Sequence, residues 1–204
     1  MFITFEGIDG VGKTTQARML FEYFNKNNKE AILTKEPGGG GEFSMKIREL
    51  LIHYKTNQLT DLFAIYAARN EHIQNTINPA LQGGKIVICD RFFDSTIAYF
   101  CYNKTGEDLQ KALDFLNTIQ GYVAQQLKPK KTFLIDADYS IIRARLSARN
   151  EGVDDKYDNF SEEKYNQIMN LYYSIQKAEP QRMIIINGNQ GKDEIFEEIL
   201  SHIS

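Results

Sequence analysis

Cysteine, long apolar runs and excess positive charge are all scarce in this sequence. There are two cysteines, Cys89 inside an apolar run and Cys101 farther along, which make neither a disulfide framework nor a metal-ligand spacing. We therefore expect a reducing, cytoplasmic setting. No run approaches the roughly 18 apolar residues of a membrane-spanning helix. The opening residues meet the charged Glu6 too early for a signal sequence, so we expect no membrane anchor.

The net charge of -3 argues against a protein that holds a nucleic-acid backbone by general electrostatics, so we expect no nucleic-acid partner. Any anionic ligand must be bound by a local cluster of cations. Hydrophobic residues make up 42% and charged residues 25% of the chain, which excludes collagen-like, low-complexity and disordered chains. The length of 204 residues fits a single domain over residues 1–204.

Short apolar runs alternate with helix-length amphipathic segments. The runs are Phe2–Phe5, Ala31–Thr34, Ile86–Cys89, Thr132–Ile135 and Met183–Ile186. The segments are Lys13–Asn27, Leu59–Leu81, Leu109–Leu127, Ser140–Arg149, Glu162–Lys177 and Asp193–Ile203. This alternation predicts an α/β fold with a parallel sheet wrapped by helices. The stretches Glu36–Glu42 and Asn150–Asn159 are expected to be functional loops.

The strongest motif is Gly-Ile-Asp-Gly-Val-Gly-Lys-Thr at residues 7–14, directly after a predicted strand and before a predicted helix. It matches the pattern of a P-loop, in which glycines turn backbone N–H groups toward a triphosphate at the positive end of a helix. Lys13 is expected to reach the β- and γ-phosphates and the Thr14 hydroxyl to ligate Mg²⁺. The predicted ATP-binding residues are Gly7, Ile8, Asp9, Gly10, Val11, Gly12, Lys13, Thr14 and Thr15.

A second motif places Asp90 and Arg91 at the carboxyl end of the third apolar run. Ligands of open α/β sheets bind at that edge. Asp90 is expected to hold the magnesium ion through its water shell, and the planar guanidinium of Arg91 to clamp a second anionic substrate. The alternative is an ion pair that caps the strand, which would give little net stability.

A third group of cations, Arg143, Arg145 and Arg149, precedes a loop that contains Lys156. Arg145 and Arg149 are four residues apart and share a helix face. The pattern alone is equally consistent with a solvated helix face. The adjacent loop favours a lid at about residues 145–158, because phosphoryl transfer needs water excluded and positive charge brought to the transferring group.

Two other features are ambiguous from the residues alone. Glu36, Pro37 and the following glycines indicate a loop that either approaches a ligand closely or simply turns. Arg69 is at least as consistent with a surface arginine as with a binding residue. The three histidines form no metal-ligand spacing, and we assign them no chemistry.

In this order along the chain, the motifs resemble those of bacterial thymidylate kinases. The shared features are the P-loop with Asp9 at its third position, Thr34–Gly39, Ala67–Arg69, Asp90–Arg91, Ser95–Tyr99 and the arginine-rich lid. The resemblance spans essentially the whole chain. It implies a P-loop NTPase fold with a five-stranded parallel sheet flanked by helices, ATP with Mg²⁺ as phosphoryl donor, dTMP as acceptor, dTDP as product, and a homodimer.

The resemblance also implies roles for individual residues. Asp9 would bind the 3′-hydroxyl of dTMP, Arg91 its phosphate, and Arg69 the edge of thymine. The substrate site it implies comprises Asp9, Glu36, Pro37, Arg69, Arg91, Ser95, Thr96 and Tyr99. Gly10 stands where some members carry an arginine, so Arg149, with Arg145 beside it, would stabilise the transferring phosphoryl group. The catalytic set is then Lys13, Arg91, Arg145 and Arg149.

The chain departs from the family pattern at the base. Ile65 replaces the phenylalanine that usually stacks on thymine, and we expect Tyr66 or Phe63 to substitute in part. Lys156 stands where an arginine is common, which keeps the charge but loses the bidentate fork. Two other functions fit the motifs: a P-loop kinase for another deoxynucleotide or for a deoxynucleoside, and a non-catalytic regulator whose loops report ATP occupancy.

Overall fold

Five parallel strands form the centre of the fold in the order β2-β3-β1-β4-β5. The computed structural model describes residues 1–125, 127–149 and 160–203, with only the backbone at residue 149. Most of the predicted lid loop, Lys156 included, and the side chain of Arg149 lie outside this description. The strands are β1 Phe2–Glu6, β2 Ala31–Lys35, β3 Ile86–Asp90, β4 Lys131–Asp136 and β5 Met183–Asn187.

Every apolar run is confirmed as a strand, and each strand continues one residue beyond its run at the carboxyl end. The added residues are polar: Glu6, Lys35, Asp90, Asp136 and Asn187. Ladder hydrogen bonds join backbones, so a polar side chain does not end a strand by itself. Because all the strands are parallel, this extension places polar side chains together along one edge of the sheet.

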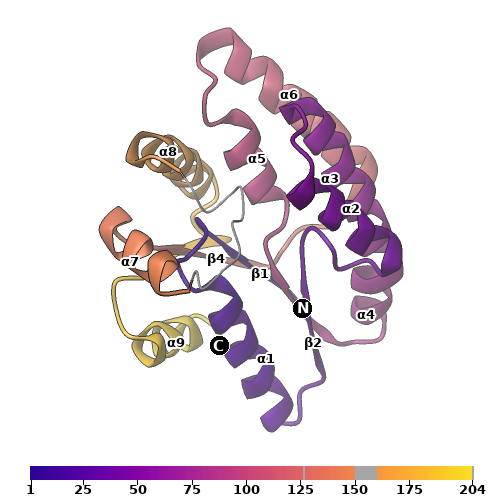
Figure 1. Cartoon of the computed structure of the whole chain (residues 1–204). Coiled ribbons are helices and arrows are strands. Elements are labelled where there is room, and N and C mark those ends of the chain that lie inside the picture. The colour runs from indigo at the N-terminus through magenta and orange to yellow at the C-terminus, as the bar shows by residue number, and fades with distance from the viewer. Residues whose placement is uncertain (126, 150–159, 204) are drawn as a thin grey trace.

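Ten helical segments surround the sheet within the described residues (Figure 1). They are α1 Lys13–Lys26, α2 Glu42–His53, α3 Gln58–His72, the π-helical turn η1 Ile73–Ile77, α4 Asn78–Gln82, α5 Phe93–Cys101, α6 Gly106–Val123, α7 Tyr139–Arg149, α8 Glu162–Ala178 and α9 Lys192–Ser201. The predicted helix Leu59–Leu81 is divided into α3, η1 and α4. The sequence did not predict α2 or α5. α2 buries Ser44 and Leu51 and exposes Phe43 and Met45, so only part of its apolar surface packs in the core.

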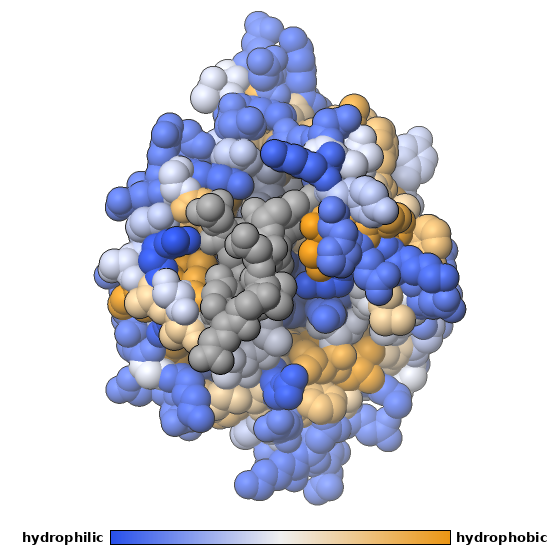
Figure 2. All heavy atoms as spheres, in the orientation of Figure 1, coloured by the Kyte–Doolittle hydropathy of each residue, from blue (hydrophilic) through white to orange (hydrophobic). Residues whose placement is uncertain are grey.

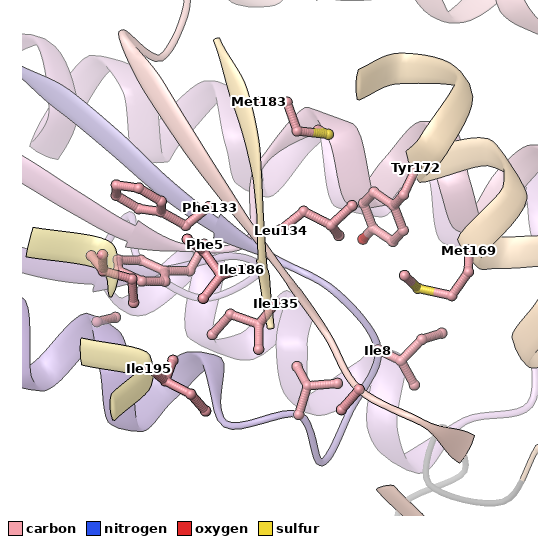
Figure 3. Close-up of a cluster of buried hydrophobic side chains, with 14 of the residues drawn as sticks. Phe5, Ile8, Phe133, Leu134, Ile135, Met169, Tyr172, Met183, Ile186 and Ile195 are labelled. Atoms are coloured by element: carbon pink, nitrogen blue, oxygen red, sulfur yellow. The ribbon is translucent and has the colours of Figure 1, made fainter. Parts of the chain in front are cut away.

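β1 alternates between the two faces of the sheet. Ile3 and Phe5 pack in the core shared with α1 and α9, whereas Thr4 and Glu6 point to the side that carries α5 and α8. Figure 3 shows the two sides of this core, with Phe5 on one side of the strands and Tyr172 of α8 on the other. The sheet thus buries polar side chains directly beneath α5.

α8 begins at Ser161, whose side chain accepts a hydrogen bond from the backbone N–H of Lys164. Tyr165, Ile168 and Tyr172 of this helix are buried in the core, and Leu171 and Ile175 are partly buried against it. No helix among the described residues is long and apolar enough to cross a membrane.

Candidate active site

A cleft of about 1130 Å³ runs along the carboxyl edge of the sheet. Its lining comes from the P-loop with the start of α1, the loop after β2, helices α2 and α3, the start of α5, and the turn before α9. Single ligand pockets measure roughly 300–1,000 Å³. The cleft is therefore somewhat larger than an ordinary single-ligand pocket.

At the centre of the cleft, the P-loop turns into α1. Gly12 is the N-cap of that helix in a left-handed conformation, with φ of 103°. The Lys13 side chain is 5% exposed, and its Nζ donates a hydrogen bond to the carbonyl of Ile8 at 2.8 Å. Burial, with Arg91 adding to it, lowers the pKa of Lys13 to about 8, against the opposing effect of Asp9. The lysine is therefore held ready to receive an anion.

Thr14 and Asp90 meet beside this lysine. The Thr14 hydroxyl donates a hydrogen bond to the Asp90 carboxylate, and both residues line the cleft. The pair places a hydroxyl and a carboxylate oxygen next to the phosphate cradle, and Mg²⁺ takes oxygen ligands of this kind. The alternative, an ion pair between Asp90 and Arg91 that caps the strand, is wrong, because Arg91 pairs with Asp9 instead.

Arg91 is held on three sides. Its Nη2 lies 2.8 Å from Asp9 Oδ1, its Nη1 donates to Ser95 Oγ at 2.8 Å, and its guanidinium carbon lies 5.2 Å from the centre of the Tyr99 ring. The backbone of Arg91 has φ of 71°, a conformation that costs a non-glycine residue about 1–2 kcal/mol. These contacts place a fixed cation in the cleft beside the P-loop.

Arg69 occupies the floor at the opposite end and is 2% exposed, so the surface-arginine alternative is wrong. Its Nε donates to Glu36 at 2.7 Å and its Nη2 to Thr96 at 2.8 Å, while the guanidinium lies between the rings of Tyr66 and Phe92. Within the described part of the chain, Nη1 of Arg69 is buried with no hydrogen-bond partner. A buried donor in this state calls for an acceptor from a ligand or from water.

Glu36 fixes Arg69 in place. Its other carboxylate oxygen lies 2.9 Å from Nδ1 of His72, and Nε2 of that ring lies 2.7 Å from the hydroxyl of Thr34. Burial acts to raise the pKa of Glu36, but Arg69 and His72 outweigh it and hold that pKa below its ordinary value. The carboxylate therefore stays ionised at neutral pH in the wall of the cleft.

At the other end, Arg145 of α7 joins two loops. Its guanidinium donates to the carbonyls of Val11 and Gln190, each at 3.3 Å. Gly10 packs against the same helix: a Cβ there would lie 2.8 Å from Leu146 Cγ, and φ is +89°. There is no space for a larger residue at position 10, so any further cation at this point has to come from outside the P-loop.

A family model described as thymidylate kinase matches residues 5–199 of the chain. The chain belongs to the thymidylate kinase family. Curated relatives include the thymidylate kinase of Rickettsia bellii (strain OSU 85-389), 36% identical over 204 residues with 100% of this chain and 95% of the relative covered. That of Acinetobacter baumannii (strain AYE) is 37% identical over 209 residues, with 100% of both chains covered.

A solved structure agrees with this membership. The thymidylate kinase of Ehrlichia chaffeensis superposes with a TM-score of 0.79 at 33% identity, covering 100% of this chain and 98% of that one. The predicted P-loop fold with a five-stranded parallel sheet flanked by helices is therefore confirmed. The chain is a member of a family of ATP-dependent nucleoside monophosphate kinases.

Most of the residues predicted for a thymidylate kinase site converge on the cleft. The lining includes Asp9, Gly10, Val11, Gly12, Lys13, Thr14, Thr15, Glu36, Pro37, Arg69, Asp90, Arg91, Ser95, Thr96, Tyr99 and Arg145. Gly7 and Ile8 lie beneath the loop instead, with the Ile8 side chain in the core. The side chain of Arg149 is outside the described residues.

The substitutes expected for the stacking phenylalanine do not line the cleft. Ile65 does. Tyr66 is buried under the guanidinium of Arg69, and Phe63 is 53% exposed with its ring against Phe115. Positions 63 and 66 are three residues apart and share one side of α3, next to the face that carries Ile65 and Arg69, and neither ring lines the cleft.

Sequence reasoning missed three contributors. His72 was given no role, yet it anchors Glu36. Glu6 was considered only as a charge near the N-terminus, yet it is buried behind Arg91. Gln190 and the residues after it line the cleft beside Arg145. The signal for the last group was available, because they follow the fifth strand at the same sheet edge.

Proposed function

We propose that the protein transfers the γ-phosphoryl group of ATP to dTMP and releases dTDP. The observation that carries this proposal is the single cleft that joins a P-loop to a second, separately anchored guanidinium, that of Arg91. Two phosphate-bearing substrates can then meet between Lys13 and Arg91. Transfer would be in line and without a covalent intermediate, since the cleft supplies positioning and charge.

The donor end accommodates ATP. The P-loop amides and Lys13 would bind its phosphates, with Thr15 at the mouth of the loop. Arg145 and the turn at Gln190 would enclose its base. Lys13, whose side chain is almost fully buried, would stabilise the negative charge that develops between the two phosphates as a preorganised cation.

The acceptor end favours thymine. Asp9 lies beside Arg91, suited to the sugar hydroxyl, and Ser95, Thr96 and Tyr99 line the space between the phosphate site and Arg69. Arg69 lines this end of the cleft, and a guanidinium N–H donor there matches the carbonyl oxygen at position 4 of thymine. Cytosine carries an amino group at that position, so two donors would face each other. We expect this mismatch to lower kcat/KM for dCMP about 10²-fold or more relative to dTMP.

Mg²⁺ is part of this proposal. The Thr14 hydroxyl and the Asp90 carboxylate, already in contact beside the phosphate cradle, would hold the ion directly or through water. When bound, it neutralises phosphate charge and orients the phosphoryl group. Arg149, on the last turn of α7, is proposed to add the cation that position 10 cannot provide.

A homodimer is supported by one face of the molecule. Helices α2, α3 and α6 expose large apolar side chains, and Figure 2 shows apolar surface on the side that carries α2 and α3. The exposed residues are Phe43, Met45, Leu50, Tyr54, Leu59, Phe63, Phe115 and Tyr122. A patch of this kind is typical of a protein interface. We also infer a cytoplasmic location, which suits the buried free thiols of Cys89 and Cys101.

The acceptor specificity is tested by initial rates with dTMP, dUMP, dCMP, dGMP and thymidine at fixed ATP and Mg²⁺. We expect dTMP to give the highest kcat/KM and dCMP a value at least about 100-fold lower. A preference for thymidine over dTMP would show that Arg91 does not serve a phosphate, and the proposal would then be wrong.

A further inference from the structure

Behind Arg91 lies a buried carboxylate that has no part in the reaction described above. Glu6, at the end of β1, is 0% exposed. It accepts three hydrogen bonds: from the Phe92 backbone N–H at 2.8 Å, from the Ser95 hydroxyl, and from the Tyr172 hydroxyl at 3.1 Å. The donors come from the turn after β3, from α5 and from α8. One side chain thus joins three separate elements.

Two of these hydrogen bonds act on Arg91. Ser95 accepts from the Arg91 guanidinium and donates to Glu6, so the carboxylate orients the hydroxyl that the arginine needs. The Phe92 N–H follows Arg91 in the chain, and its bond to Glu6, together with the bond from the Arg91 N–H to the Phe5 carbonyl at 2.9 Å, holds the turn in which Arg91 has positive φ. Both the backbone and the side chain of Arg91 therefore depend on Glu6.

We propose that Glu6 is a positioning residue that sets Arg91 for the phosphate of the acceptor nucleotide, acting through Ser95 and the Phe92 backbone. Glu6 does not line the cleft, unlike Glu36, which holds the base-reading Arg69. The inference rests on the proposed function, since it assumes that the phosphate of dTMP binds at Arg91.

The electrostatics agree with this role. Burial, with Asp94 adding to it, raises the pKa of Glu6 to about 7, against the opposing effects of Ser95 and Arg91. The titratable groups that interact with it electrostatically are Arg91 and Asp94 near the start of α5, Tyr99 on α5, Cys89 on β3, Tyr172 on α8, Lys13 on α1 and Arg69 on α3. A carboxylate kept in such a place costs stability when ionised. Its role in positioning Arg91 accounts for a buried carboxylate at this place.

The test compares two ligands that differ only in the phosphate. The dissociation constant of dTMP and the inhibition constant of thymidine are measured for the wild-type enzyme and for Glu6→Gln, together with the KM for ATP. The glutamine amide keeps the shape of the carboxylate. Its NH₂ group, however, is a donor at the position where the carboxylate oxygen accepts the hydrogen bond from Ser95. We expect dTMP binding to weaken about tenfold or more, while thymidine binding and the KM for ATP stay within about twofold.

Two matched variants serve as controls. Glu36→Gln should weaken dTMP and thymidine alike, because it acts on Arg69 at the base. Glu179→Gln removes a partner of Arg182 and Lys128 outside the cleft and should change neither. Equal weakening of both ligands by Glu6→Gln, or no weakening of dTMP, would overturn the proposal.

The outcome is separable from the proposed function. If the wild-type enzyme does not phosphorylate dTMP, the proposed function fails whatever Glu6 does. If Glu6→Gln does not fold, the test uses Tyr172→Phe instead, which removes one hydrogen bond from the same carboxylate. It should weaken dTMP binding about threefold and leave thymidine unchanged, and an unchanged affinity for dTMP would overturn the inference.

Discussion

The cations of the cleft are fixed by partners before any substrate arrives. Arg69 is held by Glu36 and Thr96, and Arg91 by Asp9 and Ser95. Taking an ion out of water costs several kcal/mol unless its hydrogen bonds are satisfied. The partners offset that cost, and they also remove the side-chain freedom that a substrate would otherwise have to restrict. The site is therefore arranged for binding in its free form.

Lys13 predicts a pH dependence for ATP binding. The pKa of Lys13 is lowered to about 8, so in the free enzyme this side chain loses its positive charge as the pH rises through 8. Below about pH 7 the side chain is already fully protonated, and a further fall in pH does not change its charge. We expect the affinity for ATP, measured by calorimetry between pH 6.5 and 9.5, to be constant on the acid side and to fall about tenfold per pH unit well above pH 8. An affinity that is flat across pH 8 would contradict the role of Lys13.

The residues of the P-loop could be predicted from the sequence because their roles depend on spacing along one stretch of chain. The roles of His72 and Glu6 could not, because their partners lie far away in sequence, and the role of Arg69 follows only from the resemblance to thymidylate kinases. His72 contacts Glu36 and Thr34, and Glu6 contacts Ser95 and Tyr172. Only the topology of the sheet brings such positions together.

At the scale of elements, the strands could be predicted and some helices could not. A strand buried on both faces leaves a continuous apolar run, and all five runs were found. α2 was not predicted, although Phe43, Ile47 and Leu50 recur at helical spacing, and Phe43 and Leu50 of that stripe are exposed. The proposed homodimer would cover that exposed face.

α7 supports a prediction about catalysis. Because Gly10 packs against Leu146 and cannot be replaced by a larger cation, we expect Arg149 on this helix to act on the transferring group. Arg149→Ala should lower kcat about 100-fold or more while the KM for dTMP changes less than about threefold, measured by steady-state kinetics.

Arg143→Ala removes a cation from the same helix and provides the control, with kcat expected near that of the wild type. An effect of Arg149→Ala confined to KM would remove the catalytic assignment from Arg149 and leave it as a binding residue.

At the scale of the whole molecule, the apolar face of α2, α3 and α6 predicts self-association. Phe63 is 53% exposed and packs edge-on against Phe115 of α6, so a charge there would be placed in the proposed interface. We expect sedimentation velocity to give a dimer of the 23.5 kDa chain for the wild type and a monomer for Phe63→Asp, because an unpaired charge in an interface costs several kcal/mol.

Tyr23→Ser, on the exposed side of α1, should remain a dimer. A wild-type protein that sediments as a monomer at micromolar concentration would rule out the homodimer, and a dimeric Phe63→Asp variant would place the interface elsewhere.

The central claim is that a phosphoryl group passes between two nucleotides held in one cleft. It is tested most directly by incubating the protein with Mg²⁺, dTMP and ATP labelled at the γ-phosphate, and separating the products. We expect the label on dTDP with the wild type and none with Lys13→Ala, which should unfold within a few degrees of the wild type because the lysine supports binding rather than the core. Label released only as inorganic phosphate, or undiminished transfer by the correctly folded Lys13→Ala, would contradict the account.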